Sequence, residues 1–409
     1  MRQGFSFHLL RASERARLHF DFCDRIETGV ERFRQRGTNS GRRDDLWLSR
    51  FHSGFIPQSF GFILTGERKG FSLFPMGLKE GKLDPEFLSR LLELLRKGDG
   101  RVEVGPQPGV DAAVLRLGGG YLVAASDPIT FVTEDLSYYA LVVNANDIAV
   151  MGARPQFFLG TLLLPPGIEE GEVEGIFRDL ASEAEEMDIL LLGGHTEVTP
   201  GIDRPILIGT MLGYIEEGRY YTSGGAREGD LLVLTKRIAI EGTSIIARER
   251  RDEVERHFGQ DFLERTLRFN REPGISIVRE ALIAADSGLV TAMHDITEGG
   301  FAMGAREMAV ASGTGLLVYG DELPIYEETL KLCELFGLDP LGLIGSGSLL
   351  LSVPPERADD LLAILMKEEI EARVVGEFRE REFGFMIRRG GEISPLPAYP
   401  QDEITKLFQ

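Results

Sequence analysis

Residues 144–155, NANDIAVMGARP, constrain the fold of this chain most strongly, because they put amide and acidic side chains on a helix otherwise built for burial. Small and branched residues there predict close packing against a neighbour, Gly152 permits close backbone approach, and Arg154-Pro155 is expected to end the helix. A buried carboxylate such as Asp147 needs a partner. For one isolated Asp a cap or an ordinary ion pair is the simpler interpretation, so the neighbouring segments decide.

Two earlier segments place acids at the ends of apolar runs. Residues 109–117 and 121–130 are rich in Val, Leu and Ala and are expected to be buried strands, with Asp111 and Asp127 at strand ends. Mg²⁺ binds several oxygen ligands at once, usually carboxylates together with the phosphates of a nucleotide. If these two acids and Asp147 converge, they form a metal-phosphate site.

Residues 188–200, DILLLGGHTEVTP, predict an apolar strand that breaks at Gly193-Gly194 into a polar turn. The turn carries His195, Thr196 and Glu197. Two interpretations of the histidine stay open: a structural residue hydrogen-bonded to the backbone, or a side chain that faces phosphates.

Two motifs in the second half of the chain follow apolar runs. Residues 242–244, Gly-Thr-Ser, predict a turn that opens a helix, either as a plain N-cap or as a site for a substrate phosphate. Residues 291–300, TAMHDITEGG, place His294 and Asp295 on a turn before an apolar helix that is expected to stop at Gly313. Asp295 either caps that helix or faces a substrate.

The order of these motifs resembles a known superfamily. DAAV, SD at a strand end, NDIAVMGARP, GGHT and HDITEGG are similar to the aminoimidazole ribonucleotide (AIR) synthetase superfamily. That superfamily includes thiamine-monophosphate kinase, selenophosphate synthetase and the carbamoyl-dehydrating hydrogenase-maturation protein. The resemblance covers residues 76–390 and implies an α/β (α+β) protein with an N-terminal dimerising ATP-binding domain and a C-terminal α/β domain. It therefore implies a homodimer that binds ATP and Mg²⁺.

The same resemblance implies roles for individual residues. The implied metal ligands are Asp111, Asp127 and Asp147; the implied nucleotide-binding residues are Asn146, Gly193, Gly194, His195 and Thr196; and the residues implied to place the acceptor are His294 and Asp295. The chain has no G-x-x-x-x-G-K-[ST] loop, so a nucleotide is held in this other way. The expected domains are residues 76–218 and 219–392, with a C-terminal tail over 393–409.

Departures from individual members also matter. The maturation protein ends in a Cys that carries its carbamoyl group, whereas the cysteines here are Cys23 and Cys333. A selenium role is not expected either, because no Cys stands near the start of the matching region. Thiamine-monophosphate kinase has paired acids before its AAV and an Asp in its turn, where this chain has a single Asp111 and His195, with Glu197 as a compensating acid.

We therefore expect an ATP- and Mg²⁺-dependent enzyme that activates a small substrate by phosphoryl transfer. The alternative is a non-catalytic nucleotide-binding accessory or maturation factor related to the hydrogenase-maturation protein. No motif of this chain identifies the acceptor substrate.

Charge and composition exclude several other classes. The 409 residues carry a net charge of −20, which argues against a nucleic-acid surface on residues 76–409. The chain has no run of 18 apolar residues, so no membrane span is expected. Two cysteines without a disulfide pattern favour a reducing compartment, and we expect a cytoplasmic protein.

Residues 1–75 differ from the rest in composition. They hold 13 Lys+Arg against 8 Asp+Glu, and 11 of the 25 Phe. One interpretation is an arm that contacts RNA or a membrane, since Arg interleaved with aromatics suits both. The other, which we favour, is that Met76 is the true start and the upstream stretch is translated non-coding sequence.

A chain that starts at Met76 is expected to fold, to stay in solution at least as well as the full chain, and to bind ATP equally well, because every proposed ligand follows that residue. Nucleotide titration and sedimentation of both chains check this. Unfolding, or loss of nucleotide binding, on removal of residues 1–75 would instead make the segment an integral part of the domain.

Overall fold

The computed structural model describes residues 83, 85–95, 100–107, 109–130, 132–216 and 218–408. All of these belong to the unit Met76–Gln409. Our expectations for residues 1–75 therefore lie outside the described residues.

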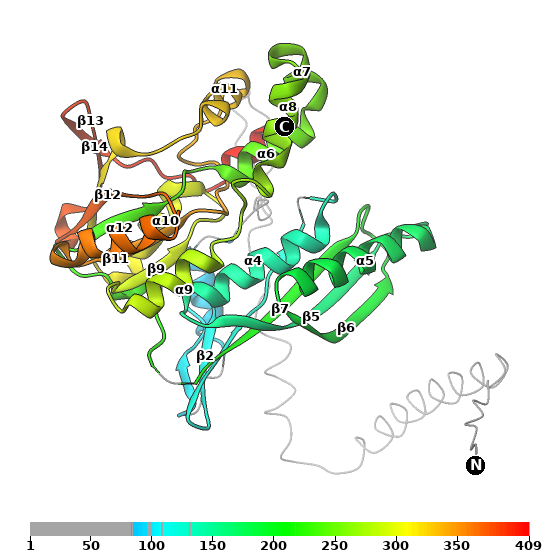
Figure 1. Cartoon of the computed structure of the whole chain (residues 1–409), viewed down its shortest axis with the longest axis horizontal. Helices are drawn as coiled ribbons and strands as arrows, with labels where there is room; N and C mark the ends of the chain where they lie inside the picture. Colours follow the sequence, from blue (N-terminus) through cyan, green and yellow to red (C-terminus); the bar gives the residue numbers. More distant parts are fainter. Residues whose placement is uncertain are drawn as a thin grey trace, which may run out of the picture. The chain divides into compact units, whose positions relative to one another are not determined.

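Two mixed sheets organise the described chain (Figure 1). The first sheet follows the order β1-β2-β3-β7-β5-β6, with β4 paired to β7, and only β5 and β6 run parallel. Its strands are β1 (Val102–Val104), β2 (Ala113–Leu117), β3 (Gly120–Ala125), β4 (Pro128–Ile129), β5 (Arg154–Leu164), β6 (Leu190–Val198) and β7 (Ile206–Ile215).

The second sheet follows the order β14-β13-β10-β12-β8-β11-β9. Its strands are β8 (Leu231–Thr235), β9 (Ala292–Asp295), β10 (Gly315–Tyr319), β11 (Leu349–Val353), β12 (Ala372–Arg379), β13 (Phe385–Arg389) and β14 (Glu392–Pro395). The helices in this half are α6 (Ile240–Glu249), α7 (Arg251–Phe258), α8 (Gln260–Leu267), α9 (Val278–Ser287), α10 (Gly300–Ser312), α11 (Glu327–Phe336) and α12 (Ala358–Lys367).

Helix α4 (Leu136–Val150) joins the two halves. It packs on the first sheet and also contacts α9 and β9 of the second half (Figure 1). Nearly all of its residues are buried, including the polar Asn144, Asn146 and Asp147. A helix that is apolar on most sides belongs between layers rather than on a surface. By contrast, α5 (Glu170–Glu186) buries only Ala184, and most of its glutamates are exposed.

The expected α/β class is confirmed, and most expected elements are present. The first half also contains the helix α3 (Pro85–Leu92). As expected, α10 stops at Gly313, whose φ of 69° suits glycine. None of the helices in the described part of the chain is long and apolar enough to cross a membrane.

Two expectations about glycine motifs are wrong. The strand does not break at Gly193-Gly194, since β6 continues to Val198. Glycine is needed at position 194 for β6 to pair with β5, because a Cβ there would lie 1.8 Å from the carbonyl oxygen of Gly160. Residues 242–244 are not a turn before a helix, because α6 already begins at Ile240. Gly242 serves close packing instead, since a Cβ there would meet Leu343 at 2.4 Å.

Glycines also form a row across the first sheet. Gly160 of β5 pairs in register with Gly209 of β7 on one side and with Gly194 of β6 on the other. A Cβ at Gly209 would lie 2.4 Å from Nδ2 of Asn144, so this glycine lets α4 approach the sheet.

We expect Gly209→Ala to lower the free energy of unfolding by about 1–3 kcal/mol, because the added methyl pushes α4 away from β7. Gly175→Ala is the control: Gly175 lies within α5 and a Cβ there meets nothing within 4 Å, so the change should raise stability by about 0.5–1 kcal/mol. Equal effects from chemical denaturation of the two variants would contradict this packing account.

Candidate functional site

Four carboxylates from both halves of the fold meet beside the C-terminal part of α4. Asp111 lies just before β2, Asp127 lies between β3 and β4, and Asp147 lies on the last turn of α4. Asp295 ends β9 in the second half. The structure thus brings together the three predicted metal ligands and both residues predicted to place the acceptor, since His294 contacts Asp111.

Repulsion among these acids is visible in the pKa of Asp147. Its side chain is buried, and burial followed by the charges of Asp127, Asp295 and Asp111 raises its pKa well above the ordinary value. A raised pKa means that the ionised form is disfavoured until a positive charge arrives.

His294 supplies one positive charge at the edge of the cluster. Its Nδ1 lies 3.1 Å from Oδ2 of Asp111, and its Nε2 lies 3.2 Å from Oε2 of Glu307 on α10. Burial disfavours the imidazolium, but the two acids outweigh burial and raise the pKa of His294 well above its usual value. Ser223 completes the contact, with its hydroxyl 3.2 Å from both Oδ2 of Asp111 and Nδ1 of His294.

The donor set fits a hard divalent cation. One ligand atom each from Asp111, His294 and Asp295 lie within 4.8 Å of one another. Both nitrogens of His294 face carboxylates, however, and a protonated ring has no lone pair for a metal. We therefore count the carboxylates, rather than the histidine, as the residues that would hold Mg²⁺.

Asn144 positions Asp127. Its Oδ1 accepts the backbone N–H of Asp127 at 2.9 Å, and its Nδ2 donates to the carbonyl oxygens of Asp127 and Ala140 at 3.2 and 2.9 Å. Asn146 has a different partner: its side-chain amide donates to the carbonyl of Ile275 and accepts from the N–H of Ile277. In this structure it links α4 to the second half of the chain.

The predicted phosphate residues of β6 lie apart from the acids. The N–H of Gly209 donates to the carbonyl of Asp127, and Gly194 is two strands from Gly209, or roughly 10 Å across the sheet. The strand from Leu190 to Val198 is exposed throughout, which includes Gly193 and Thr196. His195 pairs through Nε2 with Oε2 of Glu197 at 3.1 Å on this exposed surface.

Three residues of the site were not singled out from the sequence. Ser223 and Glu307 belong to no recognisable motif, and their roles depend on where η1 (Ser223–Gly225) and α10 pass His294. Asn144 offers more of a signal, since it precedes Asn146-Asp147 in a helix that is otherwise apolar.

The substitution Asp147→Asn is expected to raise the free energy of unfolding at pH 8 without divalent cations by on the order of 1 kcal/mol. The folded-state pKa of Asp147 lies above its unfolded value, so the wild type loses stability as the pH rises through the folded value, and the amide variant does not. Added Mg²⁺ should stabilise the wild type more than the variant. Asp179→Asn on the exposed surface of α5 is the control, and identical Mg²⁺ responses would contradict the site.

The chain matches two family descriptions. Residues 109–215 match the N-terminal domain of AIR synthase related proteins, and residues 227–388 match the C-terminal domain. A putative hydrogenase expression/formation protein of Methanocaldococcus jannaschii is 28% identical over 298 residues, which cover 70% of this chain and 85% of the relative.

Two solved structures share the fold. The hydrogenase maturation protein HypE in complex with ATP has a TM-score of 0.60 at 23% identity, covering 73% of this chain and 90% of that one. The protein AaThiL, complexed with AMPPCP and TMP, has a TM-score of 0.59 at 20% identity, covering 78% and 94%. With two matching domains in order and a shared fold, this chain belongs to the AIR synthase-related superfamily, which includes hydrogenase-maturation relatives.

Proposed function

We propose that the protein binds ATP with Mg²⁺ and activates a small substrate by phosphoryl transfer. The observation that carries the proposal is the meeting of four acids, of which Asp147 and Asp295 are buried and Asp111 and Asp127 are partly exposed. A divalent cation would relieve their mutual repulsion. HypE with ATP and AaThiL with AMPPCP, both similar in fold, support the choice of nucleotide.

In this proposal Asp111, Asp127 and Asp147 hold Mg²⁺, and Asp295 adds a fourth carboxylate from the second half of the chain. The cation would neutralise charge on the transferred phosphoryl group. The nucleotide would extend along the glycine row toward β6, where Gly193, Gly194, His195 and Thr196 offer backbone and side-chain donors. Asn146 contributes indirectly, by holding the next residue, Asp147, in place.

His294 and Asp295 would place the acceptor. While both ring nitrogens of His294 face carboxylates, the imidazolium is a poor base, so it would act on the acceptor indirectly, by orienting Asp111 and offsetting its charge. Phosphoryl transfer asks mainly for positioning and charge stabilisation, which such a fixed arrangement supplies.

The rival function is a non-catalytic nucleotide-binding accessory or maturation factor. The relative named as a hydrogenase expression/formation protein favours it. The cluster of four acids favours an enzyme that turns over ATP. Incubation with ATP, Mg²⁺ and a pool of small metabolites separates the two, because only an enzyme gives substrate-dependent release of ADP or phosphate.

The variant Asp127→Asn is expected to weaken Mg-ATP binding at least about tenfold while the fold remains intact, since it removes one charge from the ligand set. Isothermal titration and circular dichroism of wild type and variant measure both quantities. Asp203→Asn, on an exposed loop, is the matched control. If Asp127→Asn and Asp147→Asn both titrate like the wild type, the metal assignment is wrong.

We further propose that the protein is a homodimer that pairs through its first sheet. The apolar side chains exposed on β5 and β6 are Leu159, Leu190, Leu191, Leu192 and Val198. An exposed apolar edge strand is a liability that a partner normally covers.

Sedimentation at micromolar concentration should therefore give a dimer with or without ATP. Leu190→Glu is expected to shift it toward monomer, because the new charge would be buried without a partner. The control Leu330→Glu changes an exposed leucine of α11 and should leave the dimer intact. A wild-type monomer would contradict the proposal.

A further inference from the structure

Residues 268–277, which we call the strap, run from η2 (Arg268–Asn270) to the start of α9 and are tied to both ends of α4. The bonds come from side chains that the proposed reaction does not use directly. The strap therefore suggests how α4, and with it Asp147, is held in register against the second half of the chain.

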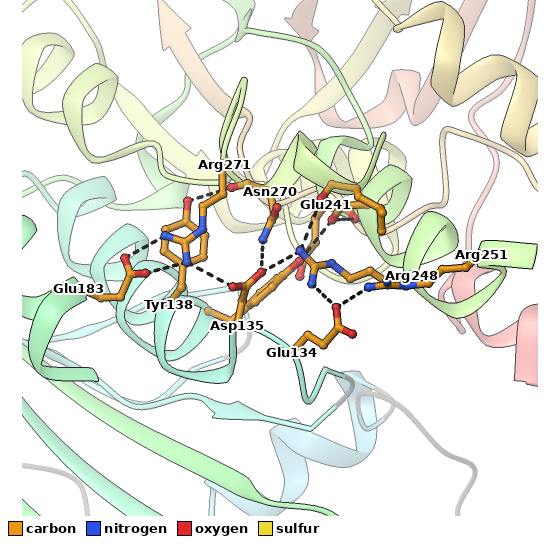
Figure 2. A network of polar contacts seen from close by, with 12 residues as sticks. Glu134, Asp135, Tyr138, Glu183, Glu241, Arg248, Arg251, Asn270 and Arg271 are labelled. Carbon is orange, nitrogen blue, oxygen red and sulfur yellow. Dashed lines mark hydrogen bonds and ion pairs between the residues drawn. The ribbon is translucent and has the colours of Figure 1, made fainter. Parts of the chain in front are cut away.

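At the N-terminal end of α4, the carboxylate of Asp135 gathers three donors from the second half (Figure 2). Nη2 of Arg248 on α6 lies at 2.7 Å, Nδ2 of Asn270 at 3.0 Å and Nη2 of Arg271 at 3.4 Å. Burial opposes the charge of Asp135, but these partners outweigh it and hold the pKa of the carboxyl below its ordinary value. Asp135 is thus ionised and shared among three donors.

Arg271 of the strap extends this contact along α4. Its guanidinium lies 3.5 Å from the centre of the Tyr138 ring and donates to both carboxylate oxygens of Glu183 on α5, at 2.9 and 2.6 Å (Figure 2). The hydroxyl of Tyr138 in turn donates to the carbonyl of Asn270 at 2.8 Å. Bidentate and stacked arginines fix orientation as well as distance.

The other end of the strap is held by Asn146. Nδ2 of Asn146 donates to the carbonyl of Ile275 at 3.0 Å, and the N–H of Ile277 donates to Oδ1 at 2.9 Å. Lys236 also holds the strap, because its Nζ donates to the carbonyl of Ser276 at 2.6 Å. Asn146 is the residue next to Asp147, so the strap ends beside the acid cluster.

The two attachments together determine the position of α4, because they lie a fixed distance apart along the helix. Asp135 and Asn146 are 11 residues apart, or about 16 Å along a helix. An α-helix does not stretch, so fixing both points sets the translation and rotation of α4 against the second half. Asp147 comes from α4 and Asp295 from β9, and their separation depends on that register.

The contacts of Asp135 with Arg248, Asn270 and Arg271, which we call the clamp, differ in burial from ordinary surface ion pairs. The side chain of Arg248 is 12% exposed, and removing the partner of a largely buried charge is costly. The pair of Glu174 with Arg178 on α5 is more than half exposed on each side, and such pairs contribute little. Glu174 is therefore the control for Asp135, whereas Glu134 also accepts from Nη1 of Arg248 at 3.0 Å and belongs to the clamp.

We propose that Asp135 is a positioning residue: held by Arg248, Asn270 and Arg271, it sets the register of α4 that places Asp147 against Asp295. The inference rests on the proposed function for its effect on Mg-ATP, but the clamp itself exists without a nucleotide.

Backbone strain is the competing explanation for any effect of changing Asp135. This residue has a φ of 58°, which glycine adopts freely, asparagine and aspartate tolerate, and alanine disfavours. Asp135→Gly removes the clamp and relieves strain, whereas Asp135→Ala removes the clamp and adds strain. The clamp predicts that both weaken the site, and strain alone predicts that only Asp135→Ala does.

The first measurement uses the full chain without nucleotide. Hydrogen–deuterium exchange of the Ile277 N–H, which Asn146 protects at the far end of the strap, should become about two- to thirtyfold faster in Asp135→Gly and remain unchanged in Glu174→Gln. A purely local role for Asp135 would leave that distant amide unchanged and would overturn the proposal.

The second measurement is titration with Mn²⁺ and ATP. Asp135→Gly should weaken binding by a similar factor, and Asp135→Asn, whose one amide oxygen keeps an acceptor for Arg248 and Asn270, should recover part of it. If Asp135→Gly does not fold, Arg271→Lys, which keeps the charge but loses the bidentate contact, takes its place with the same two readouts. Faster exchange with no Mn²⁺-ATP binding in the wild type would disprove the proposed function and leave the clamp standing; wild-type binding with unchanged exchange would disprove the clamp alone.

Discussion

The repulsion among four carboxylates, of which Asp147 and Asp295 are buried, is the constraint on which the rest of this structure depends. Each of Asp111, Asp127, Asp147 and Asp295 comes from a different element, so the acids meet only if both sheets and α4 are correctly placed. Like charges held close together lower stability, and proteins tolerate this loss at sites where the charge serves a function. His294, clamped between Asp111 and Glu307, offsets part of the charge within the protein.

Helix α4 meets this constraint with three polar residues near its C-terminus. Successive residues of an α-helix are separated by about 100°, so Asn144, Asn146 and Asp147 point in three directions. Asn144 holds Asp127 on the first sheet, Asn146 holds the strap, and Asp147 faces the other acids. The apolar residues between them pack on both halves of the chain. Much of the geometry of the site therefore passes through one helix.

The sequence predicts that the three acids Asp111, Asp127 and Asp147 converge, but not which residues surround them. Asp111, Asp127 and Asp295 stand at ends of apolar runs, where the alternation of residue types is informative, and the order of motifs adds the family. Ser223 and Glu307 carry no such signal, because they reach His294 only through tertiary packing.

The wrong predictions concern glycines, because the sequence alone does not distinguish a glycine in a turn from one that lets two parts of the backbone approach closely. Gly193 and Gly194 read as a strand break, yet Gly194 is needed for β6 to pair with β5. Gly242 read as the opening of a helix, yet it lies within α6 and makes room for Leu343. The clamp at Asp135 could not be predicted from the sequence, because its donors lie more than a hundred residues away along the chain.

The central claim is that the four acids form a divalent-cation site for a bound nucleotide. The most direct measurement is a crystal structure with Mn²⁺ and a non-hydrolysable ATP analogue, with anomalous scattering used to locate the metal. The account predicts an anomalous peak coordinated by oxygens of Asp127, Asp147 and at least one of Asp111 and Asp295, with phosphate oxygens completing the shell. Nucleotide density with the metal elsewhere, or acids that remain bonded only to one another and to His294, would contradict it.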